Sequence, residues 1–205
     1  MTNNESYRQY FRTPQCNLEE STMSTAFPGF STPAASTEAP LEMLAACHIR
    51  IERQCATLAR LAAHLRERGS DAEARSAAAN IMRYFETSAV QHHADEERDL
   101  FPALIESMAG SDAVCIRELT QGLSADHRRL EAMWRRLRQT LEQVAAGHAA
   151  LLSEDQVASF AGLYERHMRL EEDELLPMAA RLLGAPEITR IGRAMRERRG
   201  IADIG

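Results

Sequence analysis

In this 205-residue chain, four histidines that lie on separate segments are each followed four residues later by a glutamate. The pairs are His48/Glu52, His92/Glu96, His127/Glu131 and His167/Glu171. Four residues advance an α-helix by about 6 Å and turn it only about 40° beyond a full circle, so both side chains of a pair lie on one stripe of a helix. Imidazole and carboxylate together suit first-row metals such as iron or manganese. The spacing therefore predicts a metal site built between helices.

Two of the pairs share a longer motif. The segment that begins at His92 reads HHADEERDLFP, and the segment that begins at His167 reads HMRLEEDELLP. Each segment ends in a proline ten residues after its first histidine. Because the two motifs repeat each other, Glu96 and Glu171 are the best candidates to bridge two metal ions.

The inward histidines are more informative together than singly. A lone histidine on the apolar stripe of a helix is usually a core residue with a hydrogen-bond partner. Four such imidazoles would need four separate partners, because an unpaired buried polar group costs stability. One shared metal site satisfies all of them, so we expect ligation by His48, His92, His127 and His167.

Residues next to these candidates have several possible roles. Neighbours on a helix diverge by about 100°, so His92 and His93 cannot both point the same way. The repeated motif selects His92, and His93 is expected beside the site or at the surface unless a local bend recruits it. Glu97 and Glu172 are expected to be solvated charges or hydrogen-bond partners of a ligating imidazole.

The other glutamates and histidines are assigned by position. Glu131 lies one helical turn beyond His127 and is expected to fill a terminal ligand position. Glu52 has the same spacing from its histidine, but a chance occurrence or a supporting hydrogen bond is expected there. His64 and His148 are expected to face solvent.

The periodicity of apolar residues predicts helices around these side chains. The first runs from Leu41 to Gly69, and the second covers about 71–108 with a bend in Thr87–Val90, just before His92. The remaining helices are predicted from Ser111 or Asp112 to Gly147, from Ser153 with Gln156 as its capping-box partner, and, as a short basic helix after Pro186, from about 187 to 199.

Four amphipathic helices joined by short loops predict an all-α fold. We expect an up-down-up-down four-helix bundle over residues 41–183. Residues 1–40 are rich in Ser, Thr and Pro without a helical period, so a flexible or extended arm is expected, and Met23 is an alternative start to Met1. Residues 184–205 are expected to hold the C-terminal helix and a tail.

Charge and cysteine content argue against several classes of protein. The formal net charge of -6 disfavours nucleic acid or an anionic membrane as the main partner. No apolar run approaches about 18 residues, and no secretory signal is recognisable at the N-terminus. We expect a cytoplasmic protein with reduced thiols packed as small core groups; its cysteines are Cys16, Cys47, Cys55 and Cys115.

The order of motifs resembles a known family. A histidine on the first helix, H-x-x-x-E on the second, a histidine on the third and H-x-x-x-E on the fourth is similar to the hemerythrin-like (HHE cation-binding) domain of bacterial type, over roughly residues 41–183. The resemblance implies two non-haem iron ions, oxo- or hydroxo-bridged, inside a four-helix bundle. Carried over, one iron would be bound by His48 and His92, the other by His127 and His167, with Glu96 and Glu171 as bridges.

Two departures distinguish the chain from the oxygen carriers that it resembles. The carriers have a second histidine four residues after the one on the third helix, where this chain has Glu131. They also use a five-residue step to an aspartate on the fourth helix, whereas the step to Glu171 is four. An anionic oxygen donor would favour ferric iron and leave a position open for another ligand, so reversible oxygen storage is not expected.

The resemblance implies a protein that binds, senses or detoxifies O2, NO or peroxide at a di-iron site. One alternative is iron delivery in the repair of iron–sulfur clusters, although relatives of that kind usually carry an additional cysteine motif. Another is a metal-dependent signalling module that acts on a protein partner or in a homo-oligomer, through the arm or the basic C-terminal helix. A metal-free helical bundle is the remaining alternative.

Overall fold

All regular structure in the described part of the chain, residues 39–108 and 113–201 of a computed structural model, is helical. The elements are α1 (Pro40–Arg68), α2 (Ala72–Glu86), α3 (Ser88–Asp95), η1 (Glu96–Leu100), α4 (Phe101–Ser107), α5 (Ala113–Ala145), α6 (Glu154–Leu170), η2 (Glu171–Leu175), α7 (Leu176–Leu182) and α8 (Ala185–Arg198). The all-α prediction is confirmed. The expected arm with Cys16, the Met1/Met23 alternative and the caps Ser111 and Asp112 lie outside the described residues.

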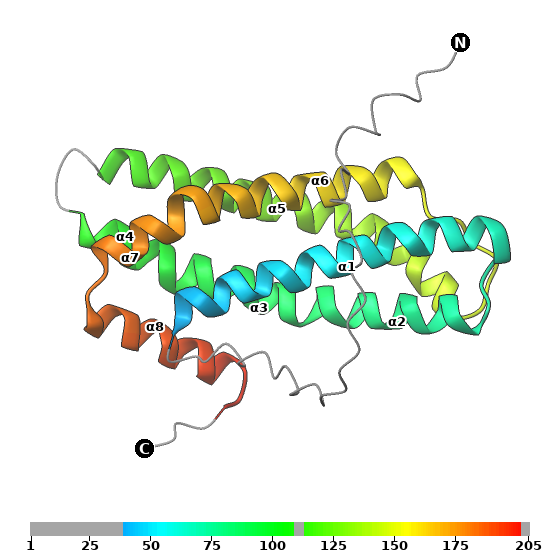
Figure 1. The fold of residues 1–205 in the computed structure, drawn as a ribbon, viewed down its shortest axis with the longest axis horizontal. Coiled ribbons are helices and arrows are strands. Elements are labelled where there is room, and N and C mark those ends of the chain that lie inside the picture. The colour runs from blue at the N-terminus through cyan, green and yellow to red at the C-terminus, as the bar shows by residue number, and fades with distance from the viewer. Residues whose placement is uncertain (1–38, 109–112, 202–205) are drawn as a thin grey trace, which may run out of the picture. The chain divides into compact units, whose positions relative to one another are not determined.

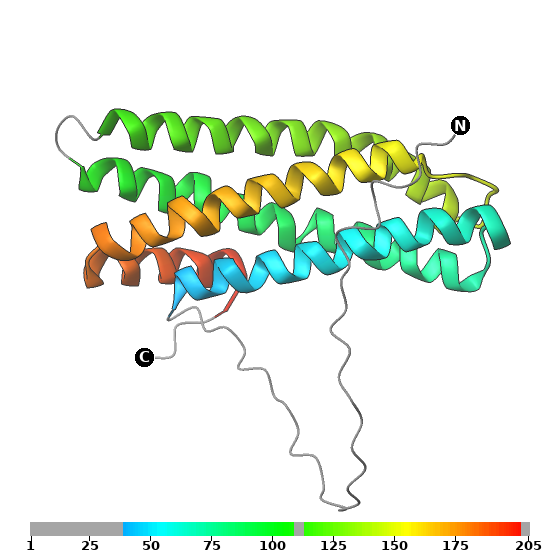
Figure 2. The ribbon, with the colours of Figure 1, turned by 45° about the horizontal axis from the view of Figure 1, so that its top comes forward.

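The long helices close a ring of four neighbours. α1 contacts α2 and α6, and α5 contacts the same two helices from the other side. Figures 1 and 2 show these segments side by side, with successive segments running in opposite directions and α8 lying at one end beside α1 and α3. The interior of this ring holds the buried side chains.

Helix ends follow the sequence signals. Gly69 ends α1 with φ 70°, a left-handed conformation that suits glycine, and its N–H donates to the Leu65 carbonyl at 3.1 Å. Ser153 caps α6 by accepting a hydrogen bond from the Gln156 N–H at 3.4 Å. Gly147, at φ 82°, follows α5. The predicted ends of α1 and α5 and the predicted start of α6 are confirmed.

The second predicted helix is divided at the expected place. Thr87 separates α2 from α3 with φ -122° and ψ -75°, outside the helical region. Its hydroxyl donates to the Arg83 carbonyl at 2.6 Å, an interaction that competes with regular helix continuation. The bend lies just before the first motif histidine, as the weak helical propensity of the stretch predicted.

Two π-helical turns, which the sequence patterns did not predict, follow the repeated histidines. The Phe101 N–H bonds the Glu96 carbonyl and the Leu176 N–H bonds the Glu171 carbonyl, each five residues back. Pro102 and Pro177 are each the second residue after one of these turns. A proline ring clashes with the carbonyl four residues before it in a regular α-helix, so both helices widen ahead of their prolines.

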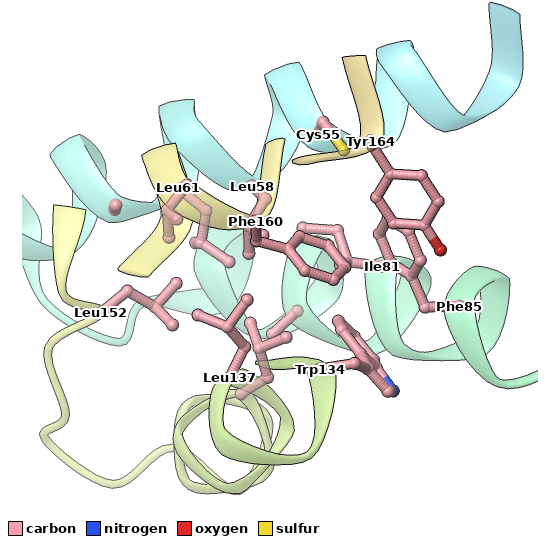
Figure 3. Packing of buried hydrophobic residues seen from close by; sticks show 14 of the residues in the cluster. Cys55, Leu58, Leu61, Ile81, Phe85, Trp134, Leu137, Leu152, Phe160 and Tyr164 are labelled. Carbon is pink, nitrogen blue, oxygen red and sulfur yellow. The ribbon is translucent and has the colours of Figure 1, made fainter. Parts of the chain in front are cut away.

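The apolar core consists of two clusters. One lies between α1, α2, α5 and α6 and includes an aromatic group of Phe85, Trp134, Phe160 and Tyr164 (Figure 3). The other joins the start of α1 to η1, α4, α5, η2, α7 and α8. The bundle has four long segments: α1, α2 to α4, α5, and α6 to α7. Each segment passes from one cluster to the other at its motif residues, as α1 does from Leu44 through His48 to Ile51. A polar layer therefore crosses the bundle between the clusters.

The C-terminal helix α8 is held against α3 and η1 by buried ion pairs. Asp95 is fully buried and accepts hydrogen bonds from Arg198 and from Arg199, the latter at 2.5 Å, and Asp99 accepts from Arg198 at 2.6 Å. Burial raises the pKa of Asp95, and the hydrogen bonds from the arginines offset this only in part. The basic residues of α8 thus hold this helix beside the polar layer.

The cysteines follow the sequence expectation in two of three described cases. Cys47 and Cys55 are buried free thiols, and burial raises the pKa of Cys55 to about 12. Cys115 is exposed, so the expectation that it packs in the core is wrong. Ile116, the next residue on α5, takes the buried position instead.

The described helices include none that could cross a lipid bilayer: long ones exist, but their sequences are too polar.

Replacing Asp95 should destabilise the fold strongly. Asp95→Ala removes the buried acceptor that Arg198 and Arg199 share and leaves Arg198 with Asp99 alone, so we expect a loss of about 3 kcal/mol in the free energy of unfolding, measured by urea denaturation. Glu165→Ala, which removes one partner of the exposed Glu165–Arg169 pair, is the control and should have little effect. Equal losses in the two variants would show that the buried pairs do not hold α8.

Candidate metal centre

Six buried side chains from all four long segments meet in the polar layer. They are His48 of α1, His92 of α3, Glu96 of η1, His127 of α5, His167 of α6 and Glu171 of η2. Their potential ligand atoms form two groups, each with all atoms within 4.8 Å of one another. The first position combines His48 and His92 with both glutamates, and the second combines His127 and His167 with the same two glutamates.

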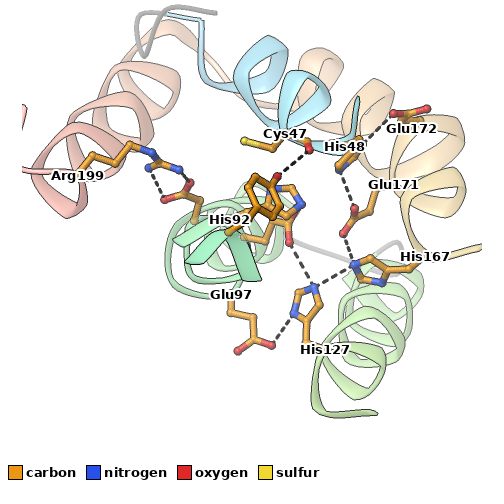
Figure 4. A network of polar contacts seen from close by, with 12 residues as sticks. Cys47, His48, His92, Glu97, His127, His167, Glu171, Glu172 and Arg199 are labelled. Atoms are coloured by element: carbon orange, nitrogen blue, oxygen red, sulfur yellow. Dashed lines mark hydrogen bonds and ion pairs between the residues drawn. The ribbon is translucent and has the colours of Figure 1, made fainter. Parts of the chain in front are cut away.

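Each glutamate places one oxygen at each position. Glu96 contacts the Nε2 atoms of His92 and His127 with different oxygens, both at 3.3 Å. Glu171 contacts the Nε2 atoms of His48 and His167 with different oxygens, at 3.1 and 3.0 Å (Figure 4). A carboxylate that divides its oxygens between two donor groups has the geometry of a bridge between two cations.

The second glutamate of each motif orients a histidine on a neighbouring helix. Glu172 accepts from His48 Nδ1 at 2.8 Å, and Glu97 accepts from His127 Nδ1 at 2.8 Å (Figure 4). A proton held on Nδ1 leaves Nε2 free to bind a metal. Of the two roles considered for Glu97 and Glu172, the hydrogen-bonding role is confirmed.

The polar layer contains buried atoms that lack hydrogen-bond partners. In the described part of the chain, every buried side-chain nitrogen or oxygen of this kind belongs to His48, His92, His93, Glu96, His167 or Glu171. Each such atom costs about 1–3 kcal/mol when nothing satisfies it. The atoms converge from different helices instead of being scattered, and imidazole and carboxylate are suitable metal donors, so the residues present fit a metal centre.

The protein alone does not balance the charges of this layer. Burial lowers the pKa of His92 to about 3, whereas the close carboxylates of Glu171 and Glu172 overcome the effect of burial at His48 and raise its pKa to about 9. Burial, together with the neighbouring Glu171, raises the pKa of Glu96, while the close imidazoles of His167 and His48 outweigh burial and lower the pKa of Glu171. Two adjacent buried carboxylates resist ionising together, and bound cations would remove that conflict.

The structure does not bring Glu131 to either position. Its side chain is exposed, as is that of Glu52. The inward stripe of α5 continues from His127 to Leu130, a three-residue step, so the residue at the fourth step is turned outward. The expected terminal ligand Glu131 is therefore corrected to a surface residue.

The other histidines differ in how well their positions were predicted. His93 is only partly exposed, and its ring stacks on that of His127, with 4.0 Å between centroids. His64 is also partly buried and lies 3.0 Å from Asp71, so it does not simply face solvent. His148 is exposed, as expected. Sequence position showed that His93 adjoins the site but gave no sign that it contacts a residue of the second position.

Comparison with known proteins agrees with this arrangement. The family model described as the hemerythrin HHE cation binding domain matches residues 39–179. The chain is also 31% identical over 169 residues to an uncharacterized protein of Haemophilus influenzae, an alignment that covers 82% of this chain and 95% of that relative. The matched residues include every side chain of both positions.

The orienting glutamates give a test of the metal centre. Glu97→Ala removes the acceptor that holds His127, so we expect metal affinity at the second position to fall about 10–100-fold. Titration with Co(II), followed by its absorption bands, measures the affinity. Glu131→Ala is the control and should leave the titration unchanged because Glu131 is exposed. A larger loss in Glu131→Ala than in Glu97→Ala would contradict this assignment.

Proposed function

We propose, because this chain belongs to the hemerythrin HHE cation-binding family, that it holds two non-haem iron ions in the polar layer and binds O2, NO or peroxide there. The observation that carries the proposal is the division of Glu96 and Glu171 between two pairs of histidines. Iron, when bound, supplies the redox chemistry that such ligands require.

The number of donors supports an open position for a small ligand. Each position receives two imidazoles and one oxygen from each bridging glutamate, which is four donors from the protein. Iron commonly takes more ligands than this, as in non-haem oxygenases with open positions. Glu131 adds no donor because it is exposed, so its carboxylate no longer supports the expectation that ferric iron is favoured.

The protein around the layer contributes orientation and exclusion of water. Glu97 and Glu172 hold the protons of His127 and His48 on Nδ1, away from the interior. The two apolar clusters cover the layer from both ends of the bundle. A small uncharged molecule enters such surroundings more readily than a hydrated ion does, which supports a diatomic ligand or peroxide.

A signalling role is the second candidate, and one contact favours it. Asp95, the partner of Arg198 and Arg199, directly precedes the bridging Glu96. A change of ligand or oxidation state that moves Glu96 would therefore act on the ion pairs of α8.

The buried free thiols Cys47 and Cys55 suit the reducing cytoplasm that we propose as the location.

Iron content tests the di-iron proposal. Protein expressed with sufficient iron should contain about two iron ions per chain by elemental analysis, since two ligand groups are present. Glu96→Ala removes an oxygen from both positions and should retain fewer than one, whereas Glu131→Ala should retain two. An iron-free wild-type protein, or full loading of Glu96→Ala, would disprove the proposal.

Removing the metal should lower stability. Ions that bind only the folded state stabilise it by about 4 kcal/mol when their free concentration is a thousand times the dissociation constant. Thermal unfolding of the chelator-treated protein should therefore show a lower midpoint than that of the iron-loaded protein, and iron addition should restore it. Identical midpoints at saturating iron would argue against a buried metal centre.

A further inference from the structure

We propose that His93 donates a hydrogen bond to the small ligand bound at the second position, the one formed by His127 and His167. This inference rests on the proposed function, because it requires an ion at that position. It assigns a role to a histidine that the motif left beside the site.

The contacts of His93 place it against the second position. Its ring stacks on His127 with 4.0 Å between centroids and 13° between planes, and it also packs on Tyr164. One of its nitrogens lies within 4.8 Å of ligand nitrogens of both His127 and His167. Its Nε2 is buried without a hydrogen-bond partner, although the residue as a whole is partly exposed. A ring with an unsatisfied polar atom therefore adjoins the pair of imidazoles.

The same stacking argues against His93 as a further ligand of that ion. An ion bound to an imidazole lies in the plane of the ring, on the axis of the nitrogen lone pair. The rings of His93 and His127 are stacked in nearly parallel planes, so one ion cannot lie in both. His93 is consequently offset to one side of such an ion, where its N–H faces an atom that the ion has bound.

His93 also makes the two positions unequal. In the repeated motif its counterpart is Met168, which is buried in the first apolar cluster. A thioether cannot donate a hydrogen bond, whereas a neutral imidazole can. The two positions otherwise receive the same kinds of donor, so this difference directs a hydrogen-bonding ligand to the second position.

The donor also defines the class of ligand. An N–H stabilises negative charge more strongly than it stabilises a neutral atom, because charge-assisted hydrogen bonds are about twice as strong. Among ligands that reach the second position, it should therefore favour those that carry or gain negative charge once bound over those that stay neutral. Azide is a suitable probe because it is small, anionic and a hydrogen-bond acceptor.

The test compares two substitutions of nearly equal shape in the full-length, iron-loaded protein. His93→Met and His93→Gln introduce side chains of similar length, and only the second retains an N–H donor. Both should keep the iron content of the wild type. Azide affinity, measured by absorbance titration, should fall about tenfold or more in His93→Met and recover largely in His93→Gln.

Met168→Leu is the matched control at the counterpart position, and its azide affinity should equal that of the wild type. If His93→Met does not fold, as judged by its thermal midpoint, His93→Leu replaces it as the variant without a donor. Equal azide affinity in all of these proteins would overturn the role of His93 while leaving the di-iron proposal intact. Loss of one iron in His93→Met would make His93 a ligand instead. An iron-free wild type would overturn both proposals.

Discussion

The burial of four histidines and two glutamates in one layer of a helical bundle is the constraint on which the rest of the structure depends. Six ionisable groups in an apolar interior are unfavourable unless something shared satisfies them. The chain meets part of that requirement itself, because Glu97 and Glu172 take the outer nitrogens of His127 and His48. The inner nitrogen of His48 and the oxygens of Glu171 are left without hydrogen-bond partners, and the Nε2 atoms of His127 and His167 lie only 3.0 Å apart, an arrangement that suits bound cations.

The π-turns follow from the same requirement. On α1 and α5 the inward stripe takes a three-residue step after its histidine, to Ile51 and Leu130, and apolar packing resumes at once. On the other two segments the stripe must include a glutamate four residues after the histidine and then a leucine four residues further on. An α-helix turns about 40° beyond a full circle at each four-residue step, so two such steps would carry Leu100 and Leu175 away from the interior. The additional residue in each π-turn compensates for this rotation and keeps both leucines inward.

Much of this architecture was predictable because it depends on local signals. Helix boundaries at Gly69 and Ser153 and the break at Thr87 come from neighbouring residues, and the repeated motif identified the two glutamates that face both positions. The His-x-x-x-Glu spacing alone gave the wrong prediction for Glu131. A residue four positions after an inward histidine faces inward or outward according to where the apolar stripe of that helix runs, which is the phase of the stripe. The phase of the stripe on α5 could have been read from the position of Leu130. The signal that the π-turns leave in the sequence, which was not used, is two successive steps of four that end two residues before a proline.

Other features depend on contacts between distant segments and leave no local signal. Asp95 pairs with arginines about a hundred positions away, and His93 stacks on a ring from another helix. Cys115 precedes the inward Ile116, and only the orientation of α5 within the bundle decides which of the two is exposed. Such features follow from tertiary packing, which the periodicity of a single helix does not encode.

The polar layer also has a consequence for cooperativity. It divides the apolar interior into two blocks that share no buried side chain, one at the α4, α7 and α8 end and one that holds the aromatic group. Opening of one block alone would require less free energy than global unfolding and would expose the layer along its boundary. The layer is therefore the boundary at which partial opening of the bundle would give ions access to the site.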